Sequence, residues 1–260
     1  MREEKVVVEF SGGKDSTLVA LLLGLRDGCE LHLLTFDNGN LIAGIDTLHD
    51  RIRELRELWE FWRQNPWTRF PPPPFEWKFL SSSELFWRAW GNAHARGWRG
   101  EESSPVAAIP CPICVMTRHA LAAEYCKEFG IKFLADGSRG SESVIEQHPA
   151  FRECVEEWLR KEYEVKYITP LDGFSGGYVV KSLARYGINP NSCEPVCFYS
   201  GLGEIGKIDE RRAHELIRSM AETAIRYVSE AIEEMKEEGR PLLQESRFMH
   251  YVPPKRYEII

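Results

Sequence analysis

The sequence lacks any run of 18 or more apolar residues, the length that a membrane-spanning helix needs. Residues 1–4 also lead into a predicted strand without an apolar signal segment, so we expect a cytoplasmic protein with no membrane partner. Positive charge is not in excess, since 33 Lys and Arg stand against 40 Asp and Glu, a formal net charge of −7. A protein that mainly grips a nucleic-acid backbone usually has a basic surface, so any such surface here must be local.

The sequence also lacks internal repeats and has no low-complexity tract apart from the four prolines at 71–74. With 260 residues, of which 43% are hydrophobic and 28% charged, the chain can bury an ordinary core without a disulfide or a metal. Seven cysteines without a secretion signal therefore favour thiol, metal or redox chemistry over a disulfide framework.

Strand and helix patterns alternate along the chain. A buried strand is predicted at 5–10, an apolar helix at 16–25 and a second strand at 30–36. The alternation resumes with a helix at 113–129 and a strand at 131–135. This order predicts an α/β fold with a doubly wound parallel sheet.

The stretch 62–104 differs in composition from the rest of the chain. Seven of the eight tryptophans fall between Trp59 and Trp98, around the proline run, which cannot be helical and forms a stiff spacer. Arginines are interleaved with these tryptophans, so the stretch could stack on unpaired bases, but a small hydrophobic lobe or a homodimer surface is the favoured interpretation. We predict three parts: a core domain over 1–61 and 105–205, a Trp- and Pro-rich insertion over 62–104, and a long helix and tail over 206–260.

A glycine loop, Ser11-Gly12-Gly13-Lys14-Asp15-Ser16, joins the first strand to the first helix. Backbone N–H groups of such a loop and the helix dipole attract phosphates, while Lys14 adds a positive charge. The two glycines permit a close approach of the backbone, and the serines can donate hydrogen bonds. The loop therefore predicts a phosphate site.

Two common phosphate motifs are excluded by spacing. A Walker A loop needs a glycine five positions before Gly13, where Val8 stands. The dinucleotide fingerprint G-x-G-x-x-G is absent, because Lys14 follows Gly13.

The loop Ser11-Gly12-Gly13-Lys14-Asp15-Ser16 resembles the pyrophosphate-binding loop of the PP-loop ATP pyrophosphatases, the adenine nucleotide alpha hydrolase superfamily. This resemblance implies that the loop holds the β and γ phosphates of ATP and leaves the α phosphorus open to a substrate oxygen, giving an adenylated substrate and pyrophosphate. The resemblance extends to Asp37-Asn38-Gly39, where relatives contact the adenosine, and to Asp136-Gly137-Ser138-Arg139, where relatives place a second loop facing the nucleotide. It covers roughly residues 5–40 and 107–200.

The chemistry of a polyphosphate also requires Mg²⁺ to offset its charge. Asp15 or Asp136 could bind the ion directly or through water, and a loop-capping role stays open for each. A loop arginine at the edge of a sheet can clamp a phosphate or a carboxylate, so we expect Lys14, Asp15 and Arg139 to be catalytic. The expected nucleotide-binding residues are Ser11, Gly12, Gly13, Lys14, Asp15, Ser16, Asp37, Asp136, Gly137 and Ser138.

Two cysteine pairs have the short spacing of ligands to one metal ion or cluster. Cys111-Pro112-Ile113-Cys114 opens a predicted helix, and Cys193-Glu194-Pro195-Val196-Cys197 lies in a loop. Three interpretations stay open, namely a structural Zn²⁺ held by four thiolates, a [4Fe–4S] cluster held by three cysteines with one iron open for sulfide, and a redox pair that passes a persulfide. The three remaining cysteines are interpreted as small core residues: Cys29, Cys126 and Cys154.

The cysteine spacing also resembles that of the cytosolic tRNA thiolation enzymes within the PP-loop group. That resemblance implies that Cys111, Cys114 and either Cys193 or Cys197 are cluster ligands, and that a sulfur displaces AMP from an adenylated tRNA base. Adenylation followed by amide or nitrile formation beside a structural zinc is one alternative. A PAPS-reductase-like protein that binds a sulfonucleotide and a non-catalytic nucleotide sensor are two more. The acceptor is either tRNA or a small molecule, and the sulfur or nitrogen donor stays open.

Overall fold

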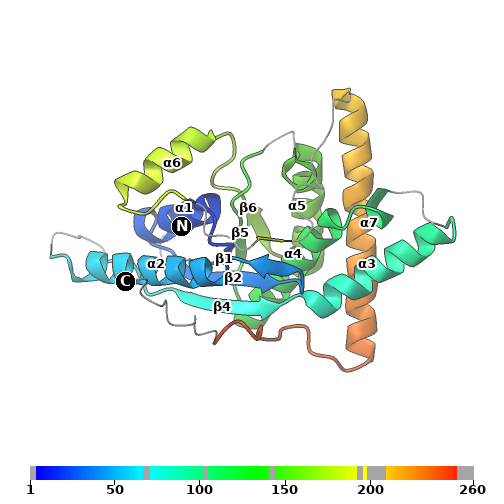
Figure 1. Cartoon of the computed structure of the whole chain (residues 1–260), viewed down its shortest axis with the longest axis horizontal. Coiled ribbons are helices and arrows are strands. Elements are labelled where there is room, and N and C mark those ends of the chain that lie inside the picture. Colours follow the sequence, from blue (N-terminus) through cyan, green and yellow to red (C-terminus); the bar gives the residue numbers. More distant parts are fainter. Residues whose placement is uncertain are drawn as a thin grey trace, which may run out of the picture.

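The computed structural model describes residues 4–66, 71–101, 105–140, 144–191, 196–197 and 209–250. Its main sheet has five strands in the order β4-β2-β1-β5-β6, and all neighbouring strands are parallel (Figure 1). The predicted α/β fold with a doubly wound parallel sheet is therefore confirmed. These strands are β1 (Lys5–Glu9), β2 (Glu30–Asp37), β4 (Glu76–Ser81), β5 (Phe133–Ala135) and β6 (Lys166–Ile168).

Helices pack on both faces of this sheet and form two cores. Val6 and Val8 of β1 face a core shared with α1, α2 and α6, whereas Val7 faces a core shared with α3, α4, α5 and α7. A strand that is apolar on both faces is typical of a parallel sheet covered on both sides. The helices are α1 (Lys14–Leu21), α2 (Ile45–Gln64), α3 (Ser83–Trp98), α4 (Cys111–Phe129), α5 (Pro149–Tyr163), α6 (Gly176–Arg185) and α7 (Glu210–Glu237), with short turns η1 (Leu22–Arg26), η2 (Pro105–Ala107) and η3 (Ile145–Gln147).

The strand order reverses beside β1. The chain passes from β1 to β2 and β4 on one side, and then returns to add β5 and β6 on the other side. Loops that leave the carboxyl ends of β1 and β5 diverge at such a switch point, which is where open α/β sheets bind their ligands. The loop at 10–13 and the loop at 136–140 therefore meet at the expected ligand edge.

Part of the predicted insertion belongs to the core of the fold. Within 62–104, β4 pairs with β2 over six residues. Phe79 of β4 is fully buried in the core between the sheet and the helices α1 and α2. Helix α3 packs along α7, where Arg88 forms an ion pair with Glu238 at 2.7 Å. Residues 76–98 thus supply a strand of the sheet and a helix of its cover, and their interpretation as an insertion into the core domain stays a prediction. Trp67 and Arg69 lie outside the described residues, and the other domain boundaries stay predictions.

The segment after α7 lies along the outer strand β4. Ser81 donates its backbone N–H to the carbonyl of Gln244 at 2.8 Å, and Ser246 donates to the carbonyl of Phe79 at 2.7 Å. Leu80 and Glu245 form an antiparallel bridge between these two bonds. The segment therefore occupies hydrogen-bonding positions that β4 would otherwise present to solvent.

A small second sheet joins two distant parts of the chain. Strand β3 (Leu41–Ala43) pairs antiparallel with β7 (Val196–Cys197), with Leu41 opposite Cys197. Among the described helices, none combines the length and the apolar character needed to cross a membrane.

Candidate active site

The glycine loop is held in a fixed conformation by its own polar groups. Gly12 adopts a left-handed backbone conformation with φ of 78°, which favours glycine. The Ser11 hydroxyl accepts a hydrogen bond from the N–H of Gly13 at 3.2 Å and lies 3.2 Å from the Ser16 hydroxyl. Because these bonds order the loop immediately before α1, the first N–H groups of the helix point to a preformed anion site.

The loop after β5 packs directly against the start of α1. A side chain added at Gly137 would come within 2.9 Å of the backbone nitrogen of Ser16 and 3.1 Å of Asp15, so only glycine fits there. Arg139 from the same loop forms an ion pair with Asp15 at 3.3 Å, and Lys14 lies 3.8 Å from the other carboxylate oxygen. The structure thus brings together the three residues that we expected to be catalytic.

The contact between Arg139 and Asp15 leaves hydrogen-bonding capacity unused. Arg139 Nε and Asp15 Oδ1 are the two atoms of this ion pair and both are buried, but their contact lacks hydrogen-bond geometry, and within the described residues neither atom has another hydrogen-bond partner. Since a buried polar atom without a partner is costly, this pair has the properties of a site that a ligand completes.

Asp136 is held differently, by groups of the protein. Its Oδ1 accepts the backbone N–H of Ser138 at 2.9 Å, and its Oδ2 accepts the hydroxyl of Tyr167 at 2.6 Å. Burial raises the pKa of Asp136 above its ordinary value, against the opposing effects of His119 and these hydrogen bonds. These contacts agree with a loop-capping role for Asp136, and its expected part in binding the nucleotide or Mg²⁺ stays a prediction.

Asp37 also caps a turn. Its Oδ1 accepts the backbone N–H of Gly39 at 2.8 Å, and its Oδ2 accepts the hydroxyl of Ser246 at 3.1 Å. The carboxylate therefore fixes the turn after β2 through the segment that follows α7. Its expected contact with a nucleotide stays a prediction.

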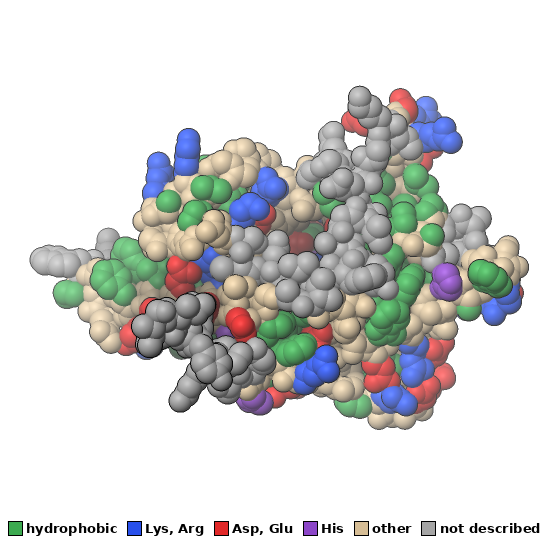
Figure 2. Space-filling model, viewed as in Figure 1, with side chains coloured by type: hydrophobic (Ala, Val, Ile, Leu, Met, Phe, Trp, Pro, Cys, Tyr) green, Lys and Arg blue, Asp and Glu red, His purple; other side chains and the backbone are tan. Residues whose placement is uncertain are grey.

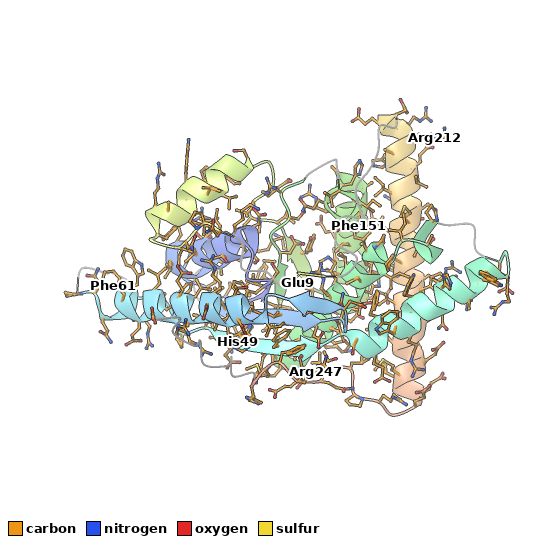
Figure 3. All side chains as sticks on the ribbon, in the orientation of Figure 1. Glu9, His49, Phe61, Phe151, Arg212 and Arg247 are labelled. Atoms are coloured by element: carbon orange, nitrogen blue, oxygen red, sulfur yellow. The ribbon has the colours of Figure 1, made fainter. Side chains whose placement is uncertain are left out.

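A buried charge network below the loop was not anticipated from the sequence. Glu9, the last residue of β1, lies near the centre of the molecule and faces α4 (Figure 3). Its Oε1 is 2.5 Å from His119 Nδ1, and its Oε2 is 3.9 Å from Arg118 Nε. Burial alone would raise the pKa of Glu9, but His119 and Arg118 outweigh it and hold this pKa below its ordinary value. A glutamate in an otherwise apolar strand is the signal that could have identified this network.

The first cysteine pair lies at the start of α4, one helical turn apart and partly accessible. Asn38, in the turn after β2, donates a hydrogen bond to Cys114 Sγ at 3.3 Å. The backbone of Cys197 pairs with Leu41, three residues beyond Asn38. The topology therefore brings the segment of the second pair to the turn that touches the first.

Cys193 and the side chain of Cys197 lie outside the described residues. Over the part of the chain that is described, no three Cys, His, Asp or Glu side chains are grouped to hold a metal. The other three cysteines are buried, in agreement with their interpretation as core residues: Cys29, Cys126 and Cys154.

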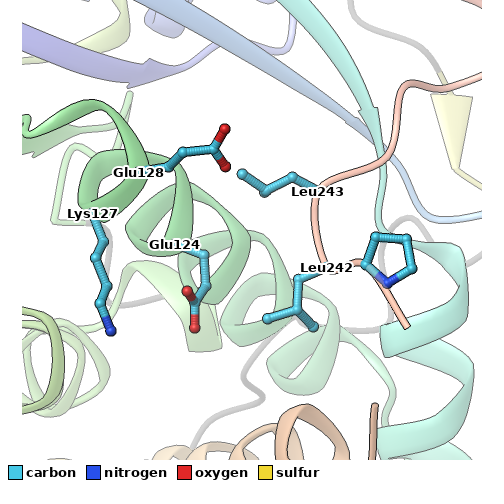
Figure 4. Close-up of a pocket in the computed structure, with 6 residues that line it drawn as sticks. Glu124, Lys127, Glu128, Leu242 and Leu243 are labelled. Atoms are coloured by element: carbon cyan, nitrogen blue, oxygen red, sulfur yellow. The ribbon is translucent and has the colours of Figure 1, made fainter. Parts of the chain in front are cut away.

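A cavity of about 450 Å³ lies far from this edge. It is formed by the last turns of α4 and the segment after α7 (Figure 4). Because α4 starts at the ligand edge of the sheet, its last turns lie at the opposite edge. The cavity is therefore separate from the candidate active site. Its lining residues are Glu124, Lys127, Glu128, Pro241, Leu242 and Leu243.

Comparison with known proteins gave similarity in fold. No family model matches the chain, and no curated protein matches its sequence. Among solved structures, the chain is similar to a predicted subunit of tRNA methyltransferase from Methanocaldococcus jannaschii, with 21% identity, a TM-score of 0.39, and coverage of 79% of this chain and 100% of that chain.

Two further structures are similar over most of the chain. The U34-tRNA thiolase NcsA from Methanococcus maripaludis, solved with its [4Fe–4S] cluster, shows 14% identity and a TM-score of 0.45, covering 97% of this chain and 80% of the other. The NMN synthetase from Francisella tularensis shows 14% identity and a TM-score of 0.46, covering 94% and 90%.

Proposed function

We propose that this protein is a PP-loop ATP pyrophosphatase that adenylates a carbonyl oxygen of its substrate. The observation that carries the proposal is the ion pair between Asp15 of the glycine loop and Arg139 of the loop after β5, at the switch point of the sheet. N–H groups at the start of α1 would bind the β and γ phosphates, and Lys14 would offset their charge. Asp15 would bind Mg²⁺ through its carboxylate, directly or through water.

In the first step, the carbonyl oxygen attacks the α phosphorus, and the bond from that phosphorus to the bridging oxygen breaks. Pyrophosphate leaves, and Lys14 and Arg139 stabilise the charge that accumulates on it. In the second step, a sulfur nucleophile attacks the activated carbon and AMP departs with the former carbonyl oxygen. The sulfur enters at the oxidation level of sulfide, so the exchange needs no oxidant.

The sulfur would be handled at the cysteine pairs. We propose that Cys111, Cys114 and one of Cys193 and Cys197 hold a [4Fe–4S] cluster. The support is the pairing of β3 with β7, which directs the second cysteine segment to the turn that contacts Cys114. Two accessible thiols one helical turn apart fit such a cluster, which would leave an iron open to carry sulfide.

Replacement of Lys14 tests the adenylation. We expect Lys14→Ala to reduce ATP-dependent pyrophosphate release by about 100-fold, the typical effect of removing one stabilising donor. Lys132→Ala is the matched control, because this exposed lysine pairs with Glu164 at the opposite edge of the sheet. Release of orthophosphate alone, or wild-type activity of Lys14→Ala, would contradict the proposal.

Metal content tests the sulfur step separately. Anaerobically purified protein should be brown and contain about four irons per chain, and Cys114→Ser should lose this iron. Tightly bound zinc in its place would overturn the cluster and favour adenylation followed by amide or nitrile formation.

A further inference from the structure

The tryptophan-rich stretch is poorly suited to bind nucleic acid, although its composition allowed that role. Its arginines are engaged with acidic partners, as in the pairs Arg96–Glu230 at 3.1 Å and Arg99–Glu101 at 2.7 Å. Trp59 and Trp77 are buried in the core, and although Trp87 and Trp98 are exposed, every arginine in the described part of the stretch is paired with a glutamate. A surface for an anionic polymer must therefore be sought elsewhere.

Helix α6 presents aromatic rings that are exposed and already stacked. Phe174, just before the helix, and Tyr178 in its first turn have ring centroids 4.5 Å apart and ring planes inclined by 21°. They are 39% and 41% exposed. Exposure of two apolar rings to water is energetically unfavourable. The outer face of such a ring pair is a suitable platform for a flat base.

The same segment is basic within an acidic protein. No Asp or Glu occurs between Asp172 and Glu194, whereas α6 carries Lys181 and Arg185. Neither of these two side chains makes an ion pair with any residue in the described ranges, and Figure 2 shows Lys and Arg side chains beside hydrophobic ones over α6. This free positive charge complements a phosphate backbone.

The platform adjoins the candidate active site. Helix α6 packs against α1, the helix that follows the glycine loop. A side chain added at Gly176, the first residue of α6, would lie 3.4 Å from Arg139 Nη1. Gly173, next to Phe174, also donates its backbone N–H to the carbonyl of Arg139 at 3.2 Å, so the segment that carries the two rings contacts the loop of the arginine that pairs with Asp15.

We propose that the surface formed by Phe174, Tyr178, Lys181 and Arg185 binds a single-stranded segment of RNA, with an unpaired base that extends the stack on the outer face of this ring pair. The inference rests on the proposed function, because it assigns the acceptor to RNA rather than to a small molecule. The phosphates flanking the base would lie along Lys181 and Arg185. Such a surface is local, which reconciles RNA binding with a net charge of −7.

The test is the affinity of the full-length protein for fluorescently labelled unfractionated tRNA, measured by anisotropy. We expect the double variant Phe174→Ala/Tyr178→Ala to bind about fivefold or more weakly, the usual effect of losing one base stack. Lys181→Gln should lower the slope of log affinity against log salt by about 1. The control is Phe61→Ala/Trp98→Ala, which removes two rings that are 62% and 87% exposed at the ends of α2 and α3.

Several results would overturn this surface. They are wild-type affinity in the α6 double variant, an equal loss in the control, or no binding of tRNA by the wild type. A dimer that dissociates on removal of the α6 rings would identify the surface as an interface between copies. Binding of ATP, followed with a fluorescent analogue, should be equal in all variants and shows that they fold.

The two proposals fail differently. If tRNA binds through α6 but pyrophosphate is never released, the surface stands and the adenylation is wrong. If pyrophosphate is released with a small acceptor and tRNA does not bind, the adenylation stands and the RNA-binding surface is wrong.

Discussion

The close approach at Gly137 gives the sharpest test of the proposed active site. In Gly137→Ala, the new methyl group would meet the backbone nitrogen of Ser16 at 2.9 Å and Asp15 at 3.1 Å. These are mainly backbone contacts at the start of α1, so no flexible side chain can yield and the loop after β5 must move outward. Overpacking of this kind typically costs about 1–3 kcal/mol. In a chain of this size, each kcal/mol lowers Tm by about 2–4 °C.

Activity should fall together with stability, because the displaced loop carries Arg139. We expect kcat/KM for ATP-dependent pyrophosphate release to fall by about tenfold or more, since small misplacements of binding groups have large effects on rate. Thermal unfolding and a coupled pyrophosphate assay measure the two effects.

Gly91→Ala is the control for Gly137→Ala. A methyl group there meets nothing within 4 Å, and the position is inside α3. Because alanine is the better helix former, this variant should be as stable as the wild type or about 0.5–1 kcal/mol more stable. Wild-type stability and activity in Gly137→Ala would refute the argument that the two loops touch.

Two further predictions concern the buried groups. In Glu9→Gln, the loss of a buried charge pair should lower the free energy of unfolding by about 3 kcal/mol at neutral pH. The folded-state pKa of Glu9 is lowered, so this contribution is present above its ordinary value of 4.5 and is lost as the pH falls through the lowered value. Chemical denaturation at several pH values should thus show the difference between wild type and variant shrinking below about pH 4.5; a constant difference would contradict the assignment. For the cysteines, burial raises the pKa of Cys126 to about 12 and that of Cys154 to about 11. In protein from which the cluster has been removed, a thiol reagent at pH 8 should therefore modify the two cysteines at the start of α4 before Cys126 and Cys154, as peptide mapping would show, and early modification of Cys126 would contradict this order.

The fold was largely predictable because its signals are local. The strand β1, the glycine loop and α1 follow one another within about 20 residues, and each has a distinct hydrophobic pattern. The strand β4 was not recognised, because four prolines precede it and its tryptophan and phenylalanine were interpreted with the surrounding aromatic residues. Only its pairing with β2, more than 40 residues earlier in the chain, makes it a strand of the main sheet.

The candidate site was predictable where the residues belong to a motif. Lys14, Asp15 and Arg139 lie together as expected, because parallel strands place their following loops at one edge. The pair of Glu9 and His119 joins residues 110 positions apart, so the sequence can indicate a buried charge in the first strand but not its partner. The same holds for the bond between Asp37 and Ser246, which depends on where the segment after α7 returns to the sheet.

That returning segment has a consequence for how the protein tolerates changes near its C-terminal end. An outer strand with unpaired N–H and C=O groups is a template for edge-to-edge aggregation, and residues 244–246 cover part of β4 in the manner of an additional strand. The same three residues supply the hydroxyl that holds Asp37. Truncation or displacement of this segment by a fused tag would thus expose an adhesive sheet edge and loosen the turn beside the candidate active site in a single change.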